Sequence, residues 1–194
     1  IVPAVAPTLI LADLTVIARA PAEMARAGVG EALSKFASVA DWKIANLLRG
    51  TDTCTAMESM LRQASVAALG SCQDLQQGDE RAYAQLMYAL LLSGFAVQAY
   101  GGSWPAYGGE HILSSLMDLL PAYGDTEGTL HGEQVGVCTI AVADLYHRMA
   151  AIDDIAAYAK PFKPLDAETL SKHFGEALAY RLLDENTPDC LEQV

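Results

Sequence analysis

Apolar residues recur every three to four positions along most of the chain, which is the spacing that gives an α-helix one apolar face. This pattern, interrupted by glycine, proline and capping residues, predicts helices over residues 21–30, 31–48, 54–75, 80–100, 110–120, 132–150, 152–160 and 167–184. The segment 80–100 is apolar almost all round, so we expect its helix to be central and buried. Residues 121–129 are expected to form a loop and the last eight residues to be loosely held.

The beginning of the chain is the exception, because Thr8–Asp13 is a short apolar run of the kind that forms a buried strand. The dinucleotide fingerprint G-x-G-x-x-G is missing, and no alternation of strands and helices indicates a Rossmann unit. The sequence contains no internal repeat and no linker long enough to separate two domains. We therefore predict an all-α fold, a helical bundle-like domain with a short β-strand segment at its N-terminus.

Composition excludes several classes of function. Hydrophobic residues make up 52% of the 194 residues and charged residues 19%, which is a globular composition. No apolar run reaches the roughly 18 residues that span a bilayer. The net charge of −12 argues against binding to nucleic-acid phosphates or to anionic membrane surfaces. The four cysteines form no C-x-x-C pair, which favours reduced thiols in a cytoplasmic protein.

Two glycine-flanked histidines are the best candidates for chemistry. His111 follows the Gly/Pro-rich bend 101–109, and His131 precedes Gly132 twenty positions later. Each is predicted to stand at the start of a helix, and side chains at such starts can converge on one point, such as a metal ion. Two histidines alone more often cap or pack locally. No lysine or arginine occurs between Arg81 and Arg148, so this part of the chain suits a cation better than a phosphate.

A third candidate ligand is Glu31, which follows Gly28-Val29-Gly30 at another glycine-flanked helix start. Two histidines and one carboxylate with an open fourth position are a common catalytic zinc set. The same set accepts iron or nickel, so it leaves the metal open. Spacing alone does not select Glu31 from the 24 acidic residues of the chain.

Other residues near the histidines have two interpretations each. Glu110 and Glu133 either orient the imidazoles by hydrogen bonding or stabilise helix starts as solvated charges. Asp41-Trp42-Lys43 lies in the middle of a predicted helix, where we expect an amphipathic surface with one aromatic anchor. The aromatic residues of the bend either wall a pocket or pack the bend itself.

A series of short motifs runs through residues 8–150. They are Ala12-Asp13-Leu14 with Ala20-Pro21, Ala27-Gly28-Val29-Gly30-Glu31, Ser34-Lys35, Ala40-Asp41-Trp42-Lys43-Ile44-Ala45, Gly102-Ser103 with Pro105-Ala106, Gly109-Glu110-His111, and His131-Gly132-Glu133-Gln134-Val135-Gly136-Val137. In their order and spacing they resemble the C-terminal, metal-binding half of glycerol-1-phosphate dehydrogenases, within the larger glycerol dehydrogenase and iron-containing alcohol dehydrogenase group.

The resemblance implies a bilobed enzyme, in which an α/β lobe binds NAD(P) and a helical lobe holds the metal. Glu31, His111 and His131 would then be the metal ligands and catalytic residues, with zinc as the first choice and iron or nickel as alternatives. Residues 1–17 would be the end of an N-terminal cofactor lobe that the chain lacks, and 18–194 the metal- and substrate-binding domain.

The reaction implied is the NAD(P)-dependent interconversion of a secondary alcohol and a ketone. Glycerol-1-phosphate and dihydroxyacetone phosphate are the first choice, and a related polyol the second. The cofactor lobe would be supplied in cis or in trans, so the chain alone is expected to be inactive, and homo-oligomerisation is left open. Ser103, Trp104 and Tyr107 would shape the substrate pocket.

Several positions depart from the family pattern. The family usually has aspartate at Glu31, and Trp104 and Tyr107 replace an arginine and a serine of its bend. Loss of the arginine makes a neutral polyol an alternative substrate. A second hypothesis is a non-catalytic helical binding or scaffold relative that keeps the fold without the chemistry. A lyase of the dehydroquinate synthase type ranks last, because it would need a strongly basic phosphate site.

Overall fold

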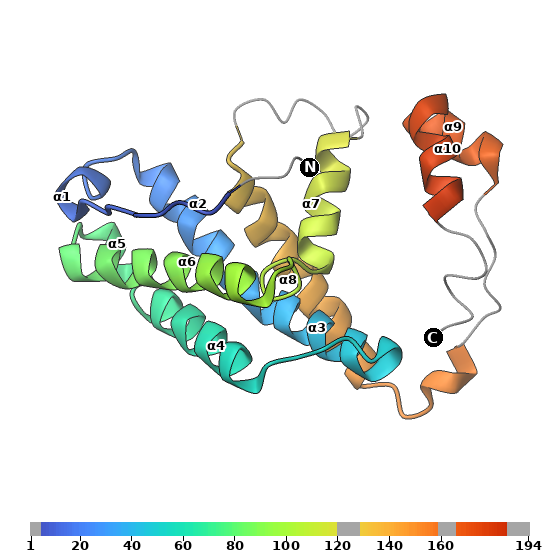
Figure 1. Cartoon of the computed structure of the whole chain (residues 1–194), viewed down its shortest axis with the longest axis horizontal. Helices are drawn as coiled ribbons and strands as arrows, with labels where there is room; N and C mark the ends of the chain where they lie inside the picture. Colours follow the sequence, from blue (N-terminus) through green and yellow to red (C-terminus); the bar gives the residue numbers. More distant parts are fainter. Residues whose placement is uncertain (1–4, 120–128, 159–165, 186–194) are drawn as a thin grey trace.

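The computed structural model describes residues 5–119, 129–158 and 166–185, and the regular structure in these ranges is helical (Figure 1). The helices are α1 (Leu14–Ile17), α2 (Ala22–Leu33), α3 (Lys35–Arg49), α4 (Thr55–Gly70), α5 (Cys72–Gln76), α6 (Glu80–Tyr100), α7 (Gly109–Leu119), α8 (His131–Ala150), a 3₁₀ turn (Ile155–Tyr158), α9 (Ala167–Phe174) and α10 (Glu176–Glu185). The predicted all-α fold is confirmed. The predictions for residues 121–128 and for the last eight residues fall outside the described ranges.

The strand predicted over Thr8–Asp13 is not seen, and residues 5–13 form no regular element. A strand needs a hydrogen-bonded partner, and the described residues contain no other strand. The segment ends instead at a helix start, where the Asp13 carboxylate accepts hydrogen bonds from the amides of Thr15, at 2.9 Å, and Val16, at 3.3 Å. The apolar run alone could not distinguish a strand from an extended segment lying on a helix.

Several predicted helix boundaries are wrong. The helix expected over 167–184 is divided into α9 and α10 at Gly175, where φ is +77°, and the helix expected over 152–160 is, in its described residues, a 3₁₀ turn at Ile155–Tyr158. The helix expected to end at Gly28 or Gly30 continues through both glycines, and the break falls at Ser34, between α2 and α3. The single helix expected over 54–75 is divided into α4 and α5 at Ser71. The Ser71 hydroxyl donates to the carbonyls of Ala67 and Ala68, at 2.9 and 3.0 Å, and so satisfies the end of α4.

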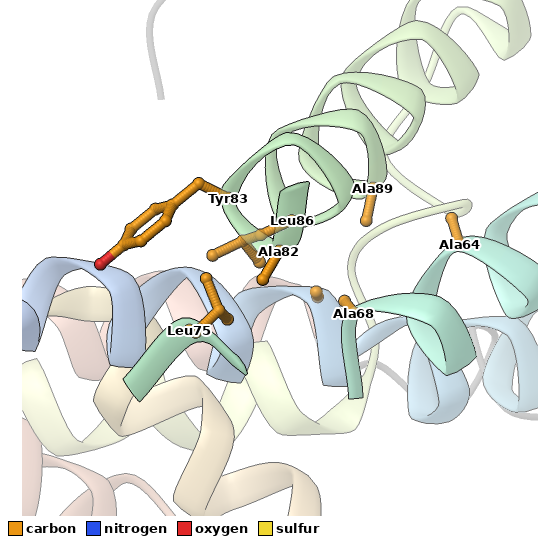
Figure 2. Packing of buried hydrophobic residues seen from close by; sticks show 8 residues of the cluster. Ala64, Ala68, Leu75, Ala82, Tyr83, Leu86 and Ala89 are labelled. Carbon is orange, nitrogen blue, oxygen red and sulfur yellow. The ribbon is translucent and has the colours of Figure 1, made fainter. Parts of the chain in front are cut away.

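The core is built largely from small residues on α2, α4, α5 and α6. Its buried members are Ala32, Ala64, Ala68, Leu75, Ala82, Tyr83, Leu86 and Ala89 (Figure 2). Alanine side chains let the helices approach closely, so much of the packing is between backbones and methyl groups. Farther along the chain, α9 and α10 pack on each other around Leu170 and Ala179, which are both buried.

Helix α6 lies at the centre of this packing, but it is buried on one side only. Tyr88 and Phe95 are 62% and 51% exposed on the other side, so the prediction of an all-round buried helix is wrong. By length and composition, α6 is the one helix of the described residues that could cross a membrane. Core helices of globular proteins meet the same criterion, and the buried side of α6 contributes half of the core cluster.

Helices α2 and α8 form the most extensive helix pair, and their backbones touch through glycines. A Cβ added to Gly30 would overlap the carbonyl of Gly132, and one added to Gly132 would overlap the carbonyl of Ala27. A Cβ on Gly136 would lie 3.0 Å from the Cα of Gly30. The pair therefore requires glycine at this crossing, and the crossing brings the residue after Gly30 beside the start of α8.

The crossing gives a direct prediction for Gly132→Ala. The added methyl group has to push α2 away, so we expect the free energy of unfolding to fall by about 1–3 kcal/mol. Urea unfolding followed by circular dichroism measures the change. The matched control is Gly94→Ala on the exposed side of α6, where an added Cβ meets nothing within 4 Å. Helix propensity should make that variant more stable by up to about 1 kcal/mol, and equal stability of the two variants would contradict the close α2–α8 contact.

Candidate metal centre

The structure brings Glu31, His111 and His131 together from three helices, α2, α7 and α8. The Glu31 Oε2 atom lies 3.5 Å from Nε2 of His111 and 3.7 Å from Nε2 of His131, and one ligand atom from each residue lies within 4.8 Å of the others. Ligand atoms bound tetrahedrally at zinc distances are roughly 3.3 Å apart. The two oxygen-to-nitrogen distances are close to this value, and all three atoms lie within 4.8 Å of one another, so small shifts of the side chains would bring them to a cation.

Glu31 Oε2 and Glu110 Oε2 are buried oxygens without a hydrogen-bond partner among the described residues, and of the two it is Glu31 Oε2 that faces both histidines. A buried polar atom with no partner is costly, which points to a group that is meant to bind there. The distance of 3.5 Å to His111 is too long for a good hydrogen bond. A cation between the three side chains would satisfy this oxygen and both imidazole nitrogens at once.

His111 is oriented by Glu110, the carboxylate that precedes it. The Glu110 side chain is fully buried, and its Oε1 atom accepts from Nδ1 of His111 at 2.7 Å and from the Gly108 amide at 3.1 Å. Nδ1 is therefore the protonated nitrogen, and Nε2 faces Glu31. Burial lowers the pKa of His111, but its contacts with Glu110 and Glu31 outweigh burial and raise it above its ordinary value.

Lys35 holds the other oxygen of Glu31. Its ammonium is buried and donates to Oε1 of Glu31 at 2.5 Å, to the Ser34 hydroxyl at 2.9 Å and to the Ala106 carbonyl at 3.3 Å. Burial raises the pKa of Glu31, but the neighbouring His111 imidazole and the charge and hydrogen bond of Lys35 outweigh burial and hold the pKa at about 2. Glu31 is consequently ionised at neutral pH and presents a single free oxygen to the histidines.

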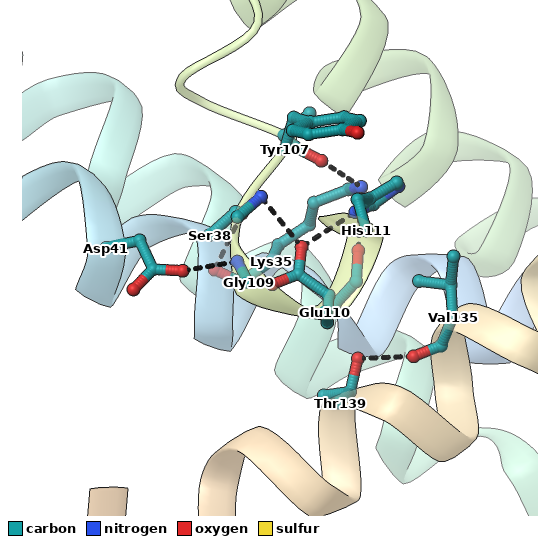
Figure 3. Close-up of polar contacts among 12 residues, drawn as sticks. Lys35, Ser38, Asp41, Tyr107, Gly109, Glu110, His111, Val135 and Thr139 are labelled. Carbon is teal, nitrogen blue, oxygen red and sulfur yellow. Dashed lines mark hydrogen bonds and ion pairs between the residues drawn. The ribbon is translucent and has the colours of Figure 1, made fainter. Parts of the chain in front are cut away.

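One face of α3 anchors the bend that leads into α7. Lys35, Ser38 and Asp41 follow each other at three-residue spacing, so they lie along one side of the helix. Ser38 donates to the carbonyl of Pro105 at 3.2 Å, and Asp41 accepts from the amide of Gly109 at 2.6 Å (Figure 3). Together with the bond from Lys35 to Ala106, these contacts fix the backbone immediately before His111.

Asp41 has a role that the sequence pattern did not indicate. The segment was expected to form an amphipathic surface with one aromatic anchor, and Trp42 is that anchor, because it is fully buried and donates from Nε1 to the Asp52 carbonyl at 2.8 Å. Asp41 is half-buried and also accepts from the hydroxyl of Tyr146 on α8. Polar residues at positions 35, 38 and 41 interrupt an otherwise apolar helix face. This spacing was the sequence signal that could have indicated a polar contact between α3 and the bend before α7.

His131 is the most accessible of the three candidate ligands. Its side chain is 60% exposed, and its ring centre lies 5.4 Å from that of His111. The Glu133 carboxylate accepts from the Leu130 amide at 3.4 Å. Two roles were predicted for Glu133, orienting an imidazole or stabilising a helix start. This contact lies at the start of α8 and agrees with the second role. The exposure of His131 leaves the site open on one side, as a substrate would require.

The three residues expected to shape a substrate pocket line one groove. Ser103, Trp104 and Tyr107 face Ile44, Leu48 and Arg49 of α3 across a groove of about 440 Å³. Tyr107 also lies over His111, with ring centres 4.9 Å apart (Figure 3), and its hydroxyl is 3.3 Å from that of Ser115. Of the three, Tyr107 is therefore the one whose ring lies against a candidate ligand, and Arg49 is the cationic residue that lines the groove.

A helical domain that gathers two imidazoles and a carboxylate in this way is a candidate metal-binding domain. No family model matches the sequence. A glycerol-1-phosphate dehydrogenase (NAD(P)+) of Bacillus licheniformis is 35% identical over 144 residues, which cover 74% of this chain and 36% of that protein. The protein of the same name from Bacillus subtilis is 30% identical over 97% of this chain and 48% of its own length. The one from Pyrococcus furiosus is 32% identical over 72% of this chain and 39% of its own length.

The chain is thus a glycerol-1-phosphate dehydrogenase-like domain. It spans between about a third and half of the length of these curated relatives, which are covered over 36%, 48% and 39% of their lengths. The family named by the motifs of residues 8–150 is confirmed.

The contact between Lys35 and Glu31 predicts the effect of Lys35→Met. Removing the ammonium leaves a partly buried carboxylate with one partner fewer, so we expect a loss of about 1–3 kcal/mol in the free energy of unfolding. Thermal and urea unfolding of the metal-free protein measure it, and adding Glu31→Gln should recover part of the loss. Arg148→Met is the matched control, because Arg148 and Asp144 form a pair of the same i,i+4 spacing with both side chains exposed. A change as small as in this control would show that the Lys35 contact adds no stability.

Proposed function

We propose that the chain is the metal- and substrate-binding half of an NAD(P)-dependent dehydrogenase that interconverts a secondary alcohol and a ketone. The observation that carries the proposal is the convergence of Glu31, His111 and His131 around a buried, unpartnered carboxylate oxygen. The names of the relatives support glycerol-1-phosphate as the first candidate substrate, with dihydroxyacetone phosphate as the ketone. A related polyol is the alternative, because Trp104 stands where the family usually has an arginine.

In this proposal each residue of the site has a defined task. Glu31, His111 and His131 hold a divalent metal, zinc as the first choice and iron or nickel as alternatives. When bound, the metal supplies Lewis-acid polarisation of the substrate oxygen. Glu110 keeps the His111 imidazole in the tautomer that leaves Nε2 free, and Lys35 keeps Glu31 ionised. Tyr107, Ser103 and Trp104 bound the space in which the alcohol lies.

NAD(P) is proposed to bind to a separate cofactor lobe, supplied in cis or in trans. In the same proposal the chain has two parts. Residues 1–17 are the end of that lobe, and residues 18–194 are the metal- and substrate-binding domain. The reaction transfers a hydride from the alcohol carbon to the nicotinamide of NAD(P)+ and releases the hydroxyl proton to water, which leaves the ketone. A cytoplasmic location fits the free thiols of Cys54, Cys72 and Cys138.

Metal content provides the first test. We expect the wild-type protein to bind about one zinc, iron or nickel ion per chain, and Glu31→Ala, His111→Ala and His131→Ala each to lose it. Inductively coupled plasma mass spectrometry measures the content. Added zinc should raise the melting temperature of the wild-type protein, because a ligand at a hundred times its Kd stabilises the native state by about 2.7 kcal/mol.

His147→Ala is the control for this experiment, since His147 is an exposed histidine on α8. It should keep the metal and the shift in melting temperature. Metal that persists in all three ligand variants would place the site elsewhere. A wild-type protein that binds no metal would support the scaffold hypothesis, in which the fold is kept without the chemistry.

A further inference from the structure

We propose that Asp41 is a positioning residue of the metal centre, which holds the first residue of α7, and thereby His111, against the helix that carries His131. This inference rests on the proposed function, because it concerns the geometry of the same three ligands. Asp41 belongs to α3 and is not one of the ligands. Its effect on the centre is therefore exerted through the backbone and through a neighbouring helix.

The Asp41 carboxylate joins two helices by two different oxygens. Oδ2 accepts from the amide of Gly109, the first residue of α7, at 2.6 Å, and Oδ1 accepts from the hydroxyl of Tyr146 on α8. Gly109 stands two residues before His111, and Tyr146 lies in the same helix as His131. Hydrogen bonds to an ionised acceptor are short and strong, so this single side chain restrains the start of α7 relative to α8.

The segment of α3 that carries Asp41 is itself held in place by neighbouring contacts. The next residue, Trp42, is fully buried, and its indole is held by the Asp52 carbonyl at 2.8 Å and by an edge-to-face contact with Tyr100 at 5.0 Å. Ser38, one turn earlier on α3, donates to the Pro105 carbonyl at 3.2 Å. The carboxylate is thus presented from a helix whose own rotation is fixed, which a positioning role requires.

The turn that Asp41 holds is packed too closely for a side chain at Gly108. A Cβ added to Gly108 would lie 2.5 Å from Oδ2 of Asp41, 2.8 Å from Oε2 of Glu110 and 2.9 Å from the Cα of Ser38. In this turn the amide of Gly108 donates to Glu110, and the amide of Gly109 donates to Asp41. Glu110 orients the imidazole ring of His111, while Asp41 fixes the backbone from which that ring projects.

Cobalt binding by the untagged chain tests this inference. In Asp41→Ala we expect the affinity for Co²⁺ to fall roughly ten- to a hundredfold, the range found when an outer partner of a metal ligand is removed. The visible absorption of bound Co²⁺ should change with it, because that spectrum reports the geometry of the ligands. Hydrogen exchange of the metal-free protein should become faster in the peptide 107–113.

Three further variants make the result specific. Asp41→Asn should restore most of the affinity, because its amide oxygen accepts from Gly109 and its amide nitrogen donates to Tyr146. Tyr146→Phe, which removes one hydroxyl, should lie between Asp41→Ala and the wild type, and it carries the test alone if Asp41→Ala does not fold. Asp144→Ala is the control, because Asp144 is exposed on α8 and pairs with Arg148.

Wild-type cobalt affinity and an unchanged spectrum in Asp41→Ala and Tyr146→Phe would overturn the inference, whatever happens to the melting temperature. That outcome is distinct from failure of the proposed function, in which the wild-type protein itself binds no cobalt. If the wild-type protein binds no cobalt, hydrogen exchange still tests whether Asp41 holds the turn before His111. Unchanged exchange over 107–113 in Asp41→Ala would show that the carboxylate does not hold the turn.

Discussion

The contact between the backbones of α2 and α8 is the constraint on which the candidate site depends. Gly30 and Gly132 meet where no Cβ fits, and each is adjacent in sequence to a candidate ligand, Glu31 or His131. Two ligands that are a hundred residues apart are thereby placed by one packing interaction. Helix α7 then packs on α8, where the buried Ser114 hydroxyl donates to Gln134 at 3.0 Å, and this brings His111 to the same point.

The second feature that determines the candidate site is a set of buried charged side chains, which need partners of opposite charge or hydrogen bonds inside the fold. The ammonium of Lys35 is balanced by Glu31, so this pair adds little net charge to the site. Glu110 and Asp41 lie behind the ligands, and no lysine or arginine occurs between Arg81 and Arg148. Burial raises the pKa of Asp41, and the charge of Glu110 adds to this, against the effect of the Gly109 amide. The surroundings of the ligands thus favour a cation over an anion.

Helical periodicity predicted the all-α class and most of the helices, because burial of one face repeats at every turn. It could not place the breaks at Ser34 and Ser71, where short-range serine hydrogen bonds occur. The two histidines were found by their glycine neighbours, whereas Glu31 required the family resemblance, since nothing local distinguishes it from other acidic residues. Asp41 was missed because its partners lie 68 and 105 residues away in the sequence, and no local pattern contains such contacts.

The proposed metal centre accommodates a glutamate at position 31, where the family pattern usually has an aspartate. Glutamate is one methylene longer, and in this structure its two oxygens have separate tasks, since Oε1 is bound to Lys35 and Oε2 faces the two histidines. The longer side chain therefore delivers one oxygen rather than two to the centre. An open, three-ligand arrangement of two nitrogens and one oxygen is what a catalytic metal needs, because the fourth position stays available to substrate. Lys35 thus binds one oxygen of the longer carboxylate and leaves the other to the two histidines.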